Sequence, residues 1–380
     1  SIRNRIMDRT QLSRLGLFDA RVPRYTSYPT APQFGGGVDA GRLVRWIEAI
    51  PEGGQISLYL HIPFCRRLCW FCACRTQGTA TASPVAAYLE TLKAELALLR
   101  RHLPRGVQYF NVGNTRLARG FWTALDRCGA VSTVMIHDTI PIDHPEVQTP
   151  QSVTRARTFL DTAAARADVI LCNSRATEAD VLRLAAPRRP RTVVAHLGVS
   201  VPEAGTPPQG AWSGAPYFVT LGTIEPRKNH ALLLDLWEEI PEAHLLICGS
   251  RGWENHAVFA RLDARPPRVH ELPGLDDGQV AALLQGSAGM LFPSFAEGYG
   301  LPPVEAAALG VPLLLNNLPI YWEVLGDIPV YADVADKYLW RKEISRMAAD
   351  HQAGRTRAEQ APRFAPPTWA AHFKTVLTLT

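Results

Sequence analysis

The sequence predicts an α/β protein built on parallel sheets, and three observations support this fold class. From about residue 108 onward, short apolar strands alternate with helices at the spacing of a doubly wound parallel sheet. A stretch rich in proline and glycine, VPEAGTPPQGAWSGAP at 201–216, separates two such series. Before them, a predicted strand at 56–62 leads into a cysteine cluster, at the strand end where α/β folds place functional loops. We therefore expect three parts, comprising residues 1–107, 108–200 and 201–380.

Composition and charge exclude several classes of protein. With 380 residues and 47% hydrophobic residues, the chain can bury two or three cores. A net charge of +5 is too small for this length to indicate nucleic-acid binding, although a basic surface suits contact with an anionic membrane. No window holds ~20 consecutive apolar residues, and the first residues, SIRNRIMDRTQLSRLG, lack the apolar stretch of a secretory signal. We expect a cytoplasmic protein, at most peripheral at the inner face of the membrane.

Cysteine usage indicates a reducing compartment and a metal cluster. Four of the seven cysteines lie within ten positions, in the segment ISLYLHIPFCRRLCWFCACRTQG. Three of them, Cys65, Cys69 and Cys72, have the spacing C-x3-C-x2-C. Three thiolates so spaced can hold three irons of a 4Fe–4S cluster and leave the fourth iron open for a ligand. Zinc is the competing interpretation, but common zinc loops need a second cysteine or histidine pair, and none follows here.

The first part of the chain resembles a known family. VPRYTSYPTAPQF at 22–34, followed by LYLHIPFCRRLCWFCACRTQ, is similar to the N-terminal part of oxygen-independent coproporphyrinogen III oxidase, a radical S-adenosylmethionine enzyme of haem synthesis. The resemblance implies that the three cysteines bind the cluster, that Cys74 is a non-ligating fourth cysteine, and that Tyr59 and Phe71 lie near S-adenosylmethionine.

The resemblance to this oxidase ends early. A helix is predicted at 83–103, with Ser83 as N-cap and Pro84 at its first position. The family would then continue with a glycine-rich GGGTP segment, but at about Val107 the sequence changes and no such segment follows. We therefore expect residues 1–107 to be a fragment of a radical S-adenosylmethionine (β/α) barrel.

The middle part shows strands and a helix of a parallel sheet. VSTVMIHDTIPIDHPE at 131–146 is a β-rich run that ends at His137 and Asp138. ADVILCNSRATEADVLRL at 167–184 predicts a strand followed by a helix capped by Ser174 or Thr177, and RTVVAHLGV at 191–199 predicts a further strand.

The third part repeats strands that end in glycine. PYFVTLGTIEPRKNHALLLDLWEEI at 216–240 predicts a strand that ends at Gly222 and Thr223, where backbone can approach a ligand closely. Arg227 and Lys228 follow at the head of the next predicted helix, where cations and free N–H groups favour a pyrophosphate, although such a pair is as often merely solvated. AHLLICGSRGWEN at 243–255 repeats the pattern with Gly249.

Two glutamates mark the next strand and helix. A strand is predicted at 288–293, a glycine-flanked loop at 297–300 and a helix at 302–309 that proline begins and glycine ends. Glu297 lies in the loop and Glu305 in the helix. Alanine, leucine and valine surround Glu305, which argues against an exposed surface charge.

These residues carry a second resemblance. GTIEPRKNH together with PSFAEGYGLPPVEAAALGVP resembles the retaining family-4 glycosyltransferases, whose GT-B fold is a pair of Rossmann-like domains. The resemblance implies that Glu297 and Glu305, an E-x7-E pair, contact the donor sugar and the ribose, that Arg227 and Lys228 neutralise the diphosphate, and that His137 faces the sugar. It implies that Glu297, Arg227, Lys228 and His137 are catalytic, and that the donor site comprises Gly222, Thr223, Arg227, Lys228, Gly249, Glu297, Gly298, Tyr299, Gly300, Leu301 and Glu305.

The same resemblance sets the expected partners. It implies a nucleotide diphosphate sugar such as GDP-mannose, a saccharide or lipid-linked acceptor, and no cofactor for glycosyl transfer. FAPPTWAAHFKTVL at 364–377 is similar to the family's last helix, which crosses back to the first domain. About a hundred residues that family members carry before the YFNVG region are replaced by the oxidase-like part, so we expect an incomplete N-terminal domain. Three hypotheses stay open: a glycosyltransferase, a radical enzyme of haem synthesis, and an inactive fusion that still binds nucleotide sugar or iron.

Overall fold

The computed structural model describes residues 40–51, 64–65, 77–78, separate positions between 83 and 94, 108–113, 119–240, 242–252, 255–355 and 364–379. The chain divides into two compact units. One comprises Ser1–Val107 with Cys128–Ala130, and the other comprises Gln108–Arg127 with Val131–Thr380. The predicted strand at 56–62 and the residues Tyr59, Cys69, Phe71, Cys72 and Cys74 lie outside the described residues.

The described part of the first unit contains two helical stretches and one pair of short strands. Helix α2 spans Ala40–Glu48. Strands β1 (Phe64–Cys65) and β2 (Gln77–Gly78) pair in parallel, with Phe64 opposite Gln77. The described positions between 83 and 94 are helical, which confirms the predicted helix at those positions.

A four-stranded parallel sheet opens the second unit. Its strands are β3 (Gln108–Asn111), β4 (Val131–Ile136), β5 (Val169–Cys172) and β6 (Thr192–Val194), in the order β3-β4-β5-β6. The connecting helices are α4 (Arg119–Cys128), α5 (Ile140–Asp143), η2 (Pro145–Val147), α6 (Pro150–Arg166) and α7 (Arg175–Ala185). β5 is buried along its whole length, as its unbroken apolar run predicts for a strand covered on both faces.

The helix after β5 begins where the sequence predicts. Ser174 is the N-cap of α7, and its side chain accepts a hydrogen bond from the backbone N–H of Thr177. β6 is shorter than the predicted strand at 191–199 because the following residues receive the last helix of the chain. The backbone oxygen of His196 lies 3.0 Å from Nδ1 of His372, and a Cβ built on Gly198 would collide with Trp369.

The second sheet of this unit has six parallel strands. They are β7 (Tyr217–Leu221), β8 (His244–Cys248), β9 (Val269–Glu271), β10 (Gly289–Phe292), β11 (Leu313–Leu315) and β12 (Val330–Tyr331), in the order β12-β11-β10-β7-β8-β9. From β7 the chain builds outward through β8 and β9 on one side, then returns to build β10, β11 and β12 on the other. The loops after β7 and β10 therefore diverge, and such a switch point opens a ligand-binding crevice at the carboxyl ends of the strands.

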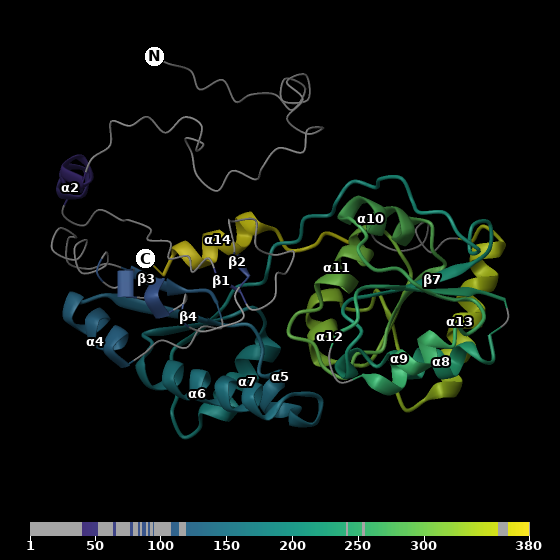
Figure 1. The fold of residues 1–380 in the computed structure, drawn as a ribbon, viewed down its shortest axis with the longest axis horizontal. Helices are drawn as coiled ribbons and strands as arrows, with labels where there is room; N and C mark the ends of the chain where they lie inside the picture. The colour runs from purple at the N-terminus through teal and green to yellow at the C-terminus, as the bar shows by residue number, and fades with distance from the viewer. Residues whose placement is uncertain are drawn as a thin grey trace, which may run out of the picture. The chain divides into compact units, whose positions relative to one another are not determined.

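Helices cover both faces of the six-stranded sheet (Figure 1). One face packs against α8 (His230–Trp237), α9 (His256–Asp263) and α13 (Lys337–Gln352). The other packs against α10 (Asp277–Gln285), α11 (Leu301–Ala308) and α12 (Pro319–Leu325). The predicted parallel α/β class is confirmed.

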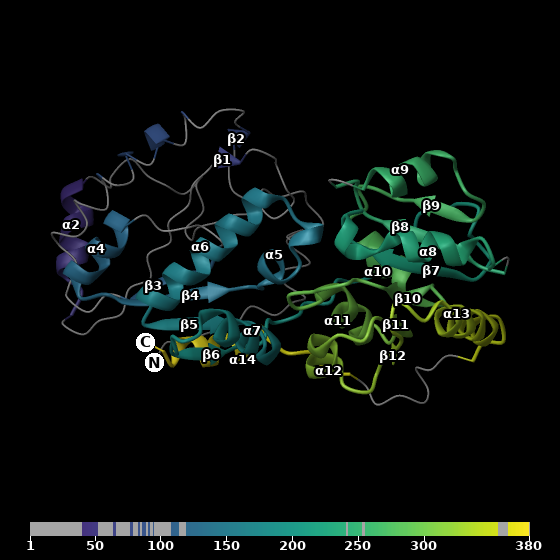
Figure 2. The ribbon, with the colours of Figure 1, turned by 90° about the horizontal axis from the view of Figure 1, so that it is seen from below.

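The last helix returns to the four-stranded sheet. α14 (Trp369–Leu377) lies on the opposite face of that sheet from α6 (Figure 2). α7 packs with α6 on the first face, whereas Val376 of α14 packs against Met135 and Leu171 on the other. Gln108 in β3 donates a hydrogen bond to the backbone oxygen of Leu379 at 3.0 Å. The end of the unit is therefore tied to its first strand.

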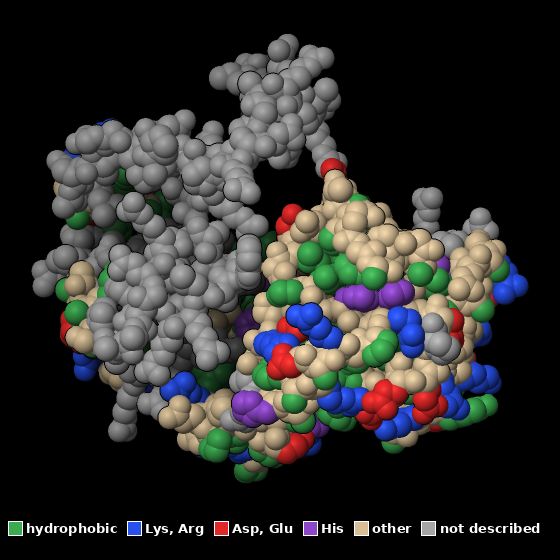
Figure 3. All heavy atoms as spheres, turned by 45° about the vertical axis from the view of Figure 1, so that its right-hand side comes forward, with side chains coloured by type: hydrophobic (Ala, Val, Ile, Leu, Met, Phe, Trp, Pro, Cys, Tyr) green, Lys and Arg blue, Asp and Glu red, His purple; other side chains and the backbone are tan. Residues whose placement is uncertain are grey.

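Among the described residues, none of the helices combines the length and apolarity needed to cross a bilayer. On the face drawn in Figure 3, the coloured Lys and Arg side chains are interspersed with Asp and Glu side chains rather than gathered into one basic strip.

Candidate functional site

The candidate site lies where the loops after β7 and β10 diverge. β7 is followed by Gly222 and then by a short 3-10 helix, η3, which spans Pro226–Lys228 and leads into α8. β10 is followed by the loop that carries Glu297 and leads into α11. The two loops meet because the backbone N–H of Phe295 donates to the oxygen of Arg227 at 2.9 Å.

Glu297 joins the two cations of η3. Its Oε1 atom lies 2.6 Å from Nζ of Lys228 and 2.7 Å from Nη1 of Arg227. Nη2 of Arg227 lies 2.6 Å from Glu225, whose side chain is only 4% exposed. These pairs bring Arg227, Lys228 and Glu297 together. The two cations lie in a 3-10 turn just before α8, not at the head of the helix itself as predicted.

The pKa values of the two cations are shifted in opposite directions. For Arg227, burial by itself lowers the pKa, but Glu297 and Glu225 outweigh burial, so the pKa is raised. For Lys228, burial is the larger effect and the pKa is lowered despite the attraction of Glu297. The ammonium of Lys228 also lies 4.3 Å from the ring centre of Phe292, a cation–π contact. The Lys228 ammonium is therefore the more weakly compensated charge.

Glycine is required where the strand ends approach each other. Gly222 has φ +132°, and a Cβ built on Gly249 would lie 1.9 Å from the backbone oxygen of Gly222. A side chain at Gly249 would thus collide with backbone. Thr223, beside Gly222, is exposed. These two glycines allow the loops after β7 and β8 to approach each other, and the approach of this backbone to a ligand stays a prediction.

Glu305 occupies a separate position. It lies half-buried in α11, and burial, with a smaller contribution from Asp277 of α10, raises its pKa to about 7. No hydrogen bond or ion pair of its carboxylate is found among the described residues. Glu305 is therefore a carboxylate at the α10–α11 side, not a member of the Arg227, Lys228 and Glu297 cluster.

The rest of the predicted donor loop has mixed roles. Gly300 has φ +81°, and a Cβ there would lie 2.7 Å from the ring of Tyr321. Tyr299 is buried and its hydroxyl donates to the backbone oxygen of Leu197 at 3.2 Å, which makes it a core residue in this structure. Leu301 begins α11 and is 37% exposed.

The His137 segment reaches the same loop from the four-stranded sheet. His137 follows β4; its Nε2 lies 2.7 Å from the oxygen of Val112, and its backbone oxygen accepts from Asn173 at 2.8 Å. A Cβ built on Gly298 would lie 3.0 Å from the His137 oxygen and 2.9 Å from the Cβ of Asp138. The loops that carry His137 and Glu297 are therefore in contact.

Several residues of the site were not predicted from the sequence. Glu225, Asp138, His230 and Glu323 belong to this group. His230 begins α8, is 1% exposed, and has its pKa lowered to about 4 by burial and by Lys228. Glu323 of α12 accepts hydrogen bonds from the N–H groups of Arg175 and Ala176 at the start of α7, at 2.6 and 2.9 Å. For Glu225 a sequence signal was available, because this acidic residue directly precedes Pro226 and two adjacent cations need compensation.

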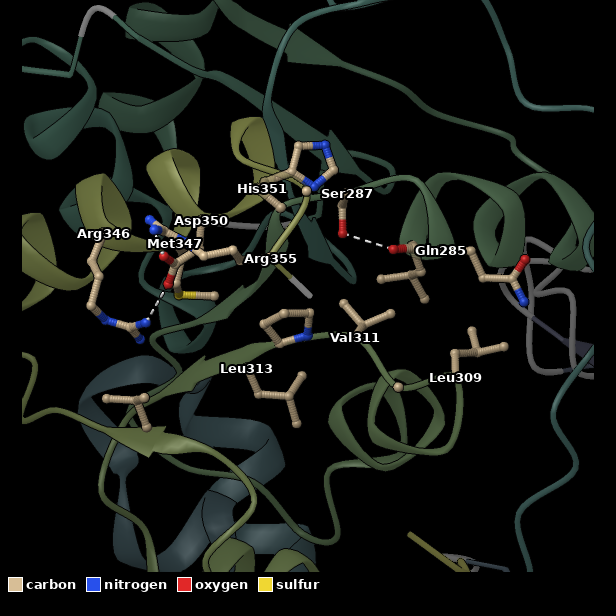
Figure 4. A pocket seen from close by; sticks show the side chains of 16 residues that line it. Gln285, Ser287, Leu309, Val311, Leu313, Arg346, Met347, Asp350, His351 and Arg355 are labelled. Atoms are coloured by element: carbon tan, nitrogen blue, oxygen red, sulfur yellow. Dashed lines mark hydrogen bonds and ion pairs between the residues drawn. The ribbon is translucent and has the colours of Figure 1, made fainter. Parts of the chain in front are cut away.

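A pocket of about 520 Å³ lies elsewhere in the second unit. Figure 4 shows its lining, which comes from the ends of α10, α11 and α13 and from the starts of β11 and β12. Arg346 and Asp350 form an ion pair at its rim, at 2.8 Å. Because it lies at the amino ends of the strands, it is distinct from the candidate site.

A family model matches part of the second unit. Residues 206–332 match the family model described as glycosyl transferases group 1. This match covers the six-stranded sheet and the site at its switch point. Together with the fold, it shows that the chain carries a glycosyltransferase domain.

Curated relatives divide between two enzymes. The chain is 30% identical over 236 residues to the serotype-specific mannosyltransferase WbdA of Escherichia coli, covering 56% of this chain and 28% of that protein. It is 64% identical over 113 residues to the oxygen-independent coproporphyrinogen III oxidase of Cereibacter sphaeroides, covering 30% of this chain and 23% of that protein. The chain thus spans about a quarter of the length of each, and it is a chimera of two segments similar to different enzymes.

Solved structures establish the fold. Sucrose-phosphate synthase from Thermosynechococcus elongatus aligns with a TM-score of 0.57 at 16% identity, covering 80% of both chains. The Anabaena protein HepE, solved in complex with UDP-glucose, aligns with a TM-score of 0.53 at 18% identity, covering 68% of this chain and 72% of that chain. The glycosyltransferase part therefore has the GT-B fold, as the sequence predicts.

Proposed function

We propose that the second unit binds a nucleotide diphosphate sugar and transfers its hexose, with retention of anomeric configuration, to an acceptor hydroxyl. The observation that carries this proposal is the cluster of Arg227, Lys228 and Glu297 at the switch point of the six-stranded sheet. Lys228 has three N–H donors and Arg227 five, so both retain donors for a diphosphate after pairing with Glu297.

The proposed chemistry uses the leaving diphosphate as the proton acceptor. The acceptor oxygen forms a bond to the anomeric carbon on the face from which the phosphate oxygen departs, and the hydroxyl proton moves to that phosphate oxygen. Arg227 and Lys228 stabilise the charge that develops on the diphosphate, and a single such donor contributes roughly 2.7–4 kcal/mol in other enzymes. Glu297 orients the donor sugar, and Glu305 accepts hydrogen bonds from the ribose.

The donor and acceptor are proposed from the relatives. The similarity to a mannosyltransferase supports a mannose donor such as GDP-mannose, and the structural likeness to a protein solved with UDP-glucose makes a uridine nucleotide the alternative. A saccharide or lipid-linked acceptor follows from the same resemblance, as does contact with the inner face of a membrane. We propose residues 108–200 as an acceptor domain, truncated relative to the family, and 201–380 as the donor domain.

A second proposal concerns the oxidase-like segment. The identity of 64% over 113 residues supports Cys65, Cys69 and Cys72 as ligands of a 4Fe–4S cluster that would serve S-adenosylmethionine chemistry. Cys65 lies in β1, whereas Cys69 and Cys72 lie outside the described residues, so no reaction step is derived from them. We propose that this segment is a remnant of the oxidase barrel without oxidase activity.

The glycosyltransferase proposal is tested by binding. A thermal-shift screen of the purified chain against UDP- and GDP-sugars should show stabilisation by at least one of them. Glu305→Ala should then reduce the binding free energy of that ligand by about 1.5–3 kcal/mol, as measured by calorimetry, because a charge-assisted hydrogen bond is lost. Glu239→Ala is the control, because Glu239 pairs with Arg341 on the surface of the same half. Unchanged affinity in the Glu305 variant would remove the assignment of the ribose contact.

A further inference from the structure

Asp138 is a carboxylate at the candidate site that neither resemblance assigns. It follows β4 by two residues, at the carboxyl edge of the four-stranded sheet. Its Oδ1 atom accepts a hydrogen bond from the N–H of Ile140 at 3.1 Å, an Asx turn that starts α5. Among the described residues, no hydrogen bond or ion pair to its Oδ2 atom is found.

The free oxygen of Asp138 faces the donor loop. A Cβ built on Gly298 would lie 3.1 Å from Oδ2 of Asp138 and 2.9 Å from its Cβ. Any side chain at Gly298 would press against this carboxylate, and Glu297 is the adjacent residue. Asp138 therefore lies next to the residue that orients the donor sugar in the proposed function.

The direct ion pairs of the two cations at the site do not involve Asp138. Arg227 pairs with Glu225 and Glu297, and Lys228 pairs with Glu297. Burial raises the pKa of Asp138 and the neighbouring Glu297 charge adds to this, while the Ile140 N–H and Arg227 oppose it. The negative charge of Asp138 thus has no direct ion-pair partner among the described residues.

The local structure does not need a charge at this position. The Asx turn uses one side-chain oxygen, and asparagine forms the same turn. A partly buried carboxylate costs more to desolvate than an amide does. A group that donates a hydrogen bond to Oδ2 would offset this cost, and a hydroxyl is the donor that a sugar supplies.

We propose that Asp138 is a substrate-contacting carboxylate that accepts a hydrogen bond from a sugar hydroxyl beside Glu297. This inference rests on the proposed function and extends it to a residue from the other sheet. The hydroxyl belongs either to the donor sugar or to the acceptor sugar, and both offer the same chemistry.

Asp138→Asn separates the charge from the turn. The affinities of UDP, GDP, UDP-glucose and GDP-mannose are measured by calorimetry for the wild-type protein and the variant. If the donor sugar is the partner, the affinity of the nucleotide sugar falls roughly tenfold, as when a charge-assisted hydrogen bond becomes a neutral one, while the affinity of the free nucleotide falls by less than about twofold. Asp143→Asn is the matched control, because Asp143 pairs with Thr139 and Arg183 in the same segment.

The acceptor sugar is tested in a second measurement. Nucleotide release from the nucleotide sugar is followed with increasing methyl α-mannoside. If the acceptor is the partner, Asp138→Asn leaves both donor affinities unchanged and raises the half-saturating mannoside concentration. Asp138→Ser, which also supports the turn, should reproduce either result, and thermal denaturation shows that both variants fold.

Three outcomes overturn the inference. An equal change in the affinities of nucleotide and nucleotide sugar, in either direction, would show that Asp138 does not contact the sugar. Unchanged donor affinities and an unchanged half-saturating mannoside concentration would show that Asp138 serves only to form the Asx turn. Failure of the wild-type protein to bind any of the four ligands would refute the proposed function together with this inference.

Discussion

Lys228→Met tests whether the fold and the ligand depend on the same cation. Methionine retains the apolar stem and removes the ammonium, which lies 2.6 Å from Glu297 and 4.3 Å from the ring centre of Phe292. Breaking a buried ion pair costs roughly 3–5 kcal/mol when it leaves a charge unpaired. Here Glu297 keeps Arg227 at 2.7 Å, so no carboxylate is left alone.

The pKa of Lys228 decides the expected size of the stability effect. Burial lowers the pKa below 10.5, so the charged lysine is less favourable in the folded than in the unfolded chain. Its charge therefore reduces the unfolding free energy below the folded pKa, and this penalty is relieved as pH rises toward 10.5. Removing the charge offsets the loss of its contacts, and we expect the unfolding free energy to change by less than about 1 kcal/mol.

Ligand binding should respond differently. A charge-assisted hydrogen bond to the diphosphate contributes about 1.5–3 kcal/mol, which corresponds to roughly a 10- to 150-fold loss of nucleotide affinity. Urea denaturation measures the first quantity and calorimetry the second. Lys337→Met is the control, because Lys337 pairs with Asp235 at the surface. A loss of more than about 3 kcal/mol in unfolding free energy, or an unchanged nucleotide affinity, would refute this reasoning.

Three further predictions use other residues. The pKa of Glu305 is raised from 4.5 to about 7, so its ionisation opposes folding and the unfolding free energy should fall as pH rises through this window. Over the same window the affinity for the nucleotide sugar should rise. Glu305→Gln should abolish both trends, as measured by denaturation and by calorimetry at a series of pH values. Glu323→Ala should lower the melting temperature, at a cost of roughly 0.5–2 kcal/mol, because the first N–H groups of α7 lose their acceptor; an unchanged melting curve would contradict this. After anaerobic reconstitution with iron and sulfide, the chain should release no more 5′-deoxyadenosine from S-adenosylmethionine than Cys69→Ala, as measured by chromatography, and a clear excess would show a working radical site.

The local elements could be predicted because their signals lie within a few residues. Ser174 caps α7 through the N–H three residues later, and the prolines at 302 and 303 with Gly310 bracket α11. The strands at 169–172 and 289–292 are buried throughout and appear in the sequence as unbroken apolar runs. In these cases a side-chain cap, a proline or glycine boundary, or a run of apolar residues identifies the element from a few neighbouring positions.

The contacts between distant loops could not be predicted in the same way. Glu323 reaches the start of α7 across 148 residues, and Asp138 meets Gly298 only because two separate sheets place their carboxyl edges together. Tyr299 lies within the predicted donor loop, but its side chain is buried and its hydroxyl donates a hydrogen bond to the backbone oxygen of Leu197. A resemblance names positions in a loop, but burial decides which of them face solvent.

The hydrogen bond between Gln108 and Leu379 brings the first and last described residues of the second unit to one corner. A unit whose ends are adjacent tolerates circular permutation and the joining of foreign sequence at that corner, because neither cuts through a strand or a core helix. A permutant that links residue 379 to residue 108 by a short glycine-rich connection, and opens the chain in the exposed stretch 203–206, should therefore fold. The same topology makes the position before residue 108 a permissive junction, at which foreign sequence can be joined without cutting the described strands of the second unit.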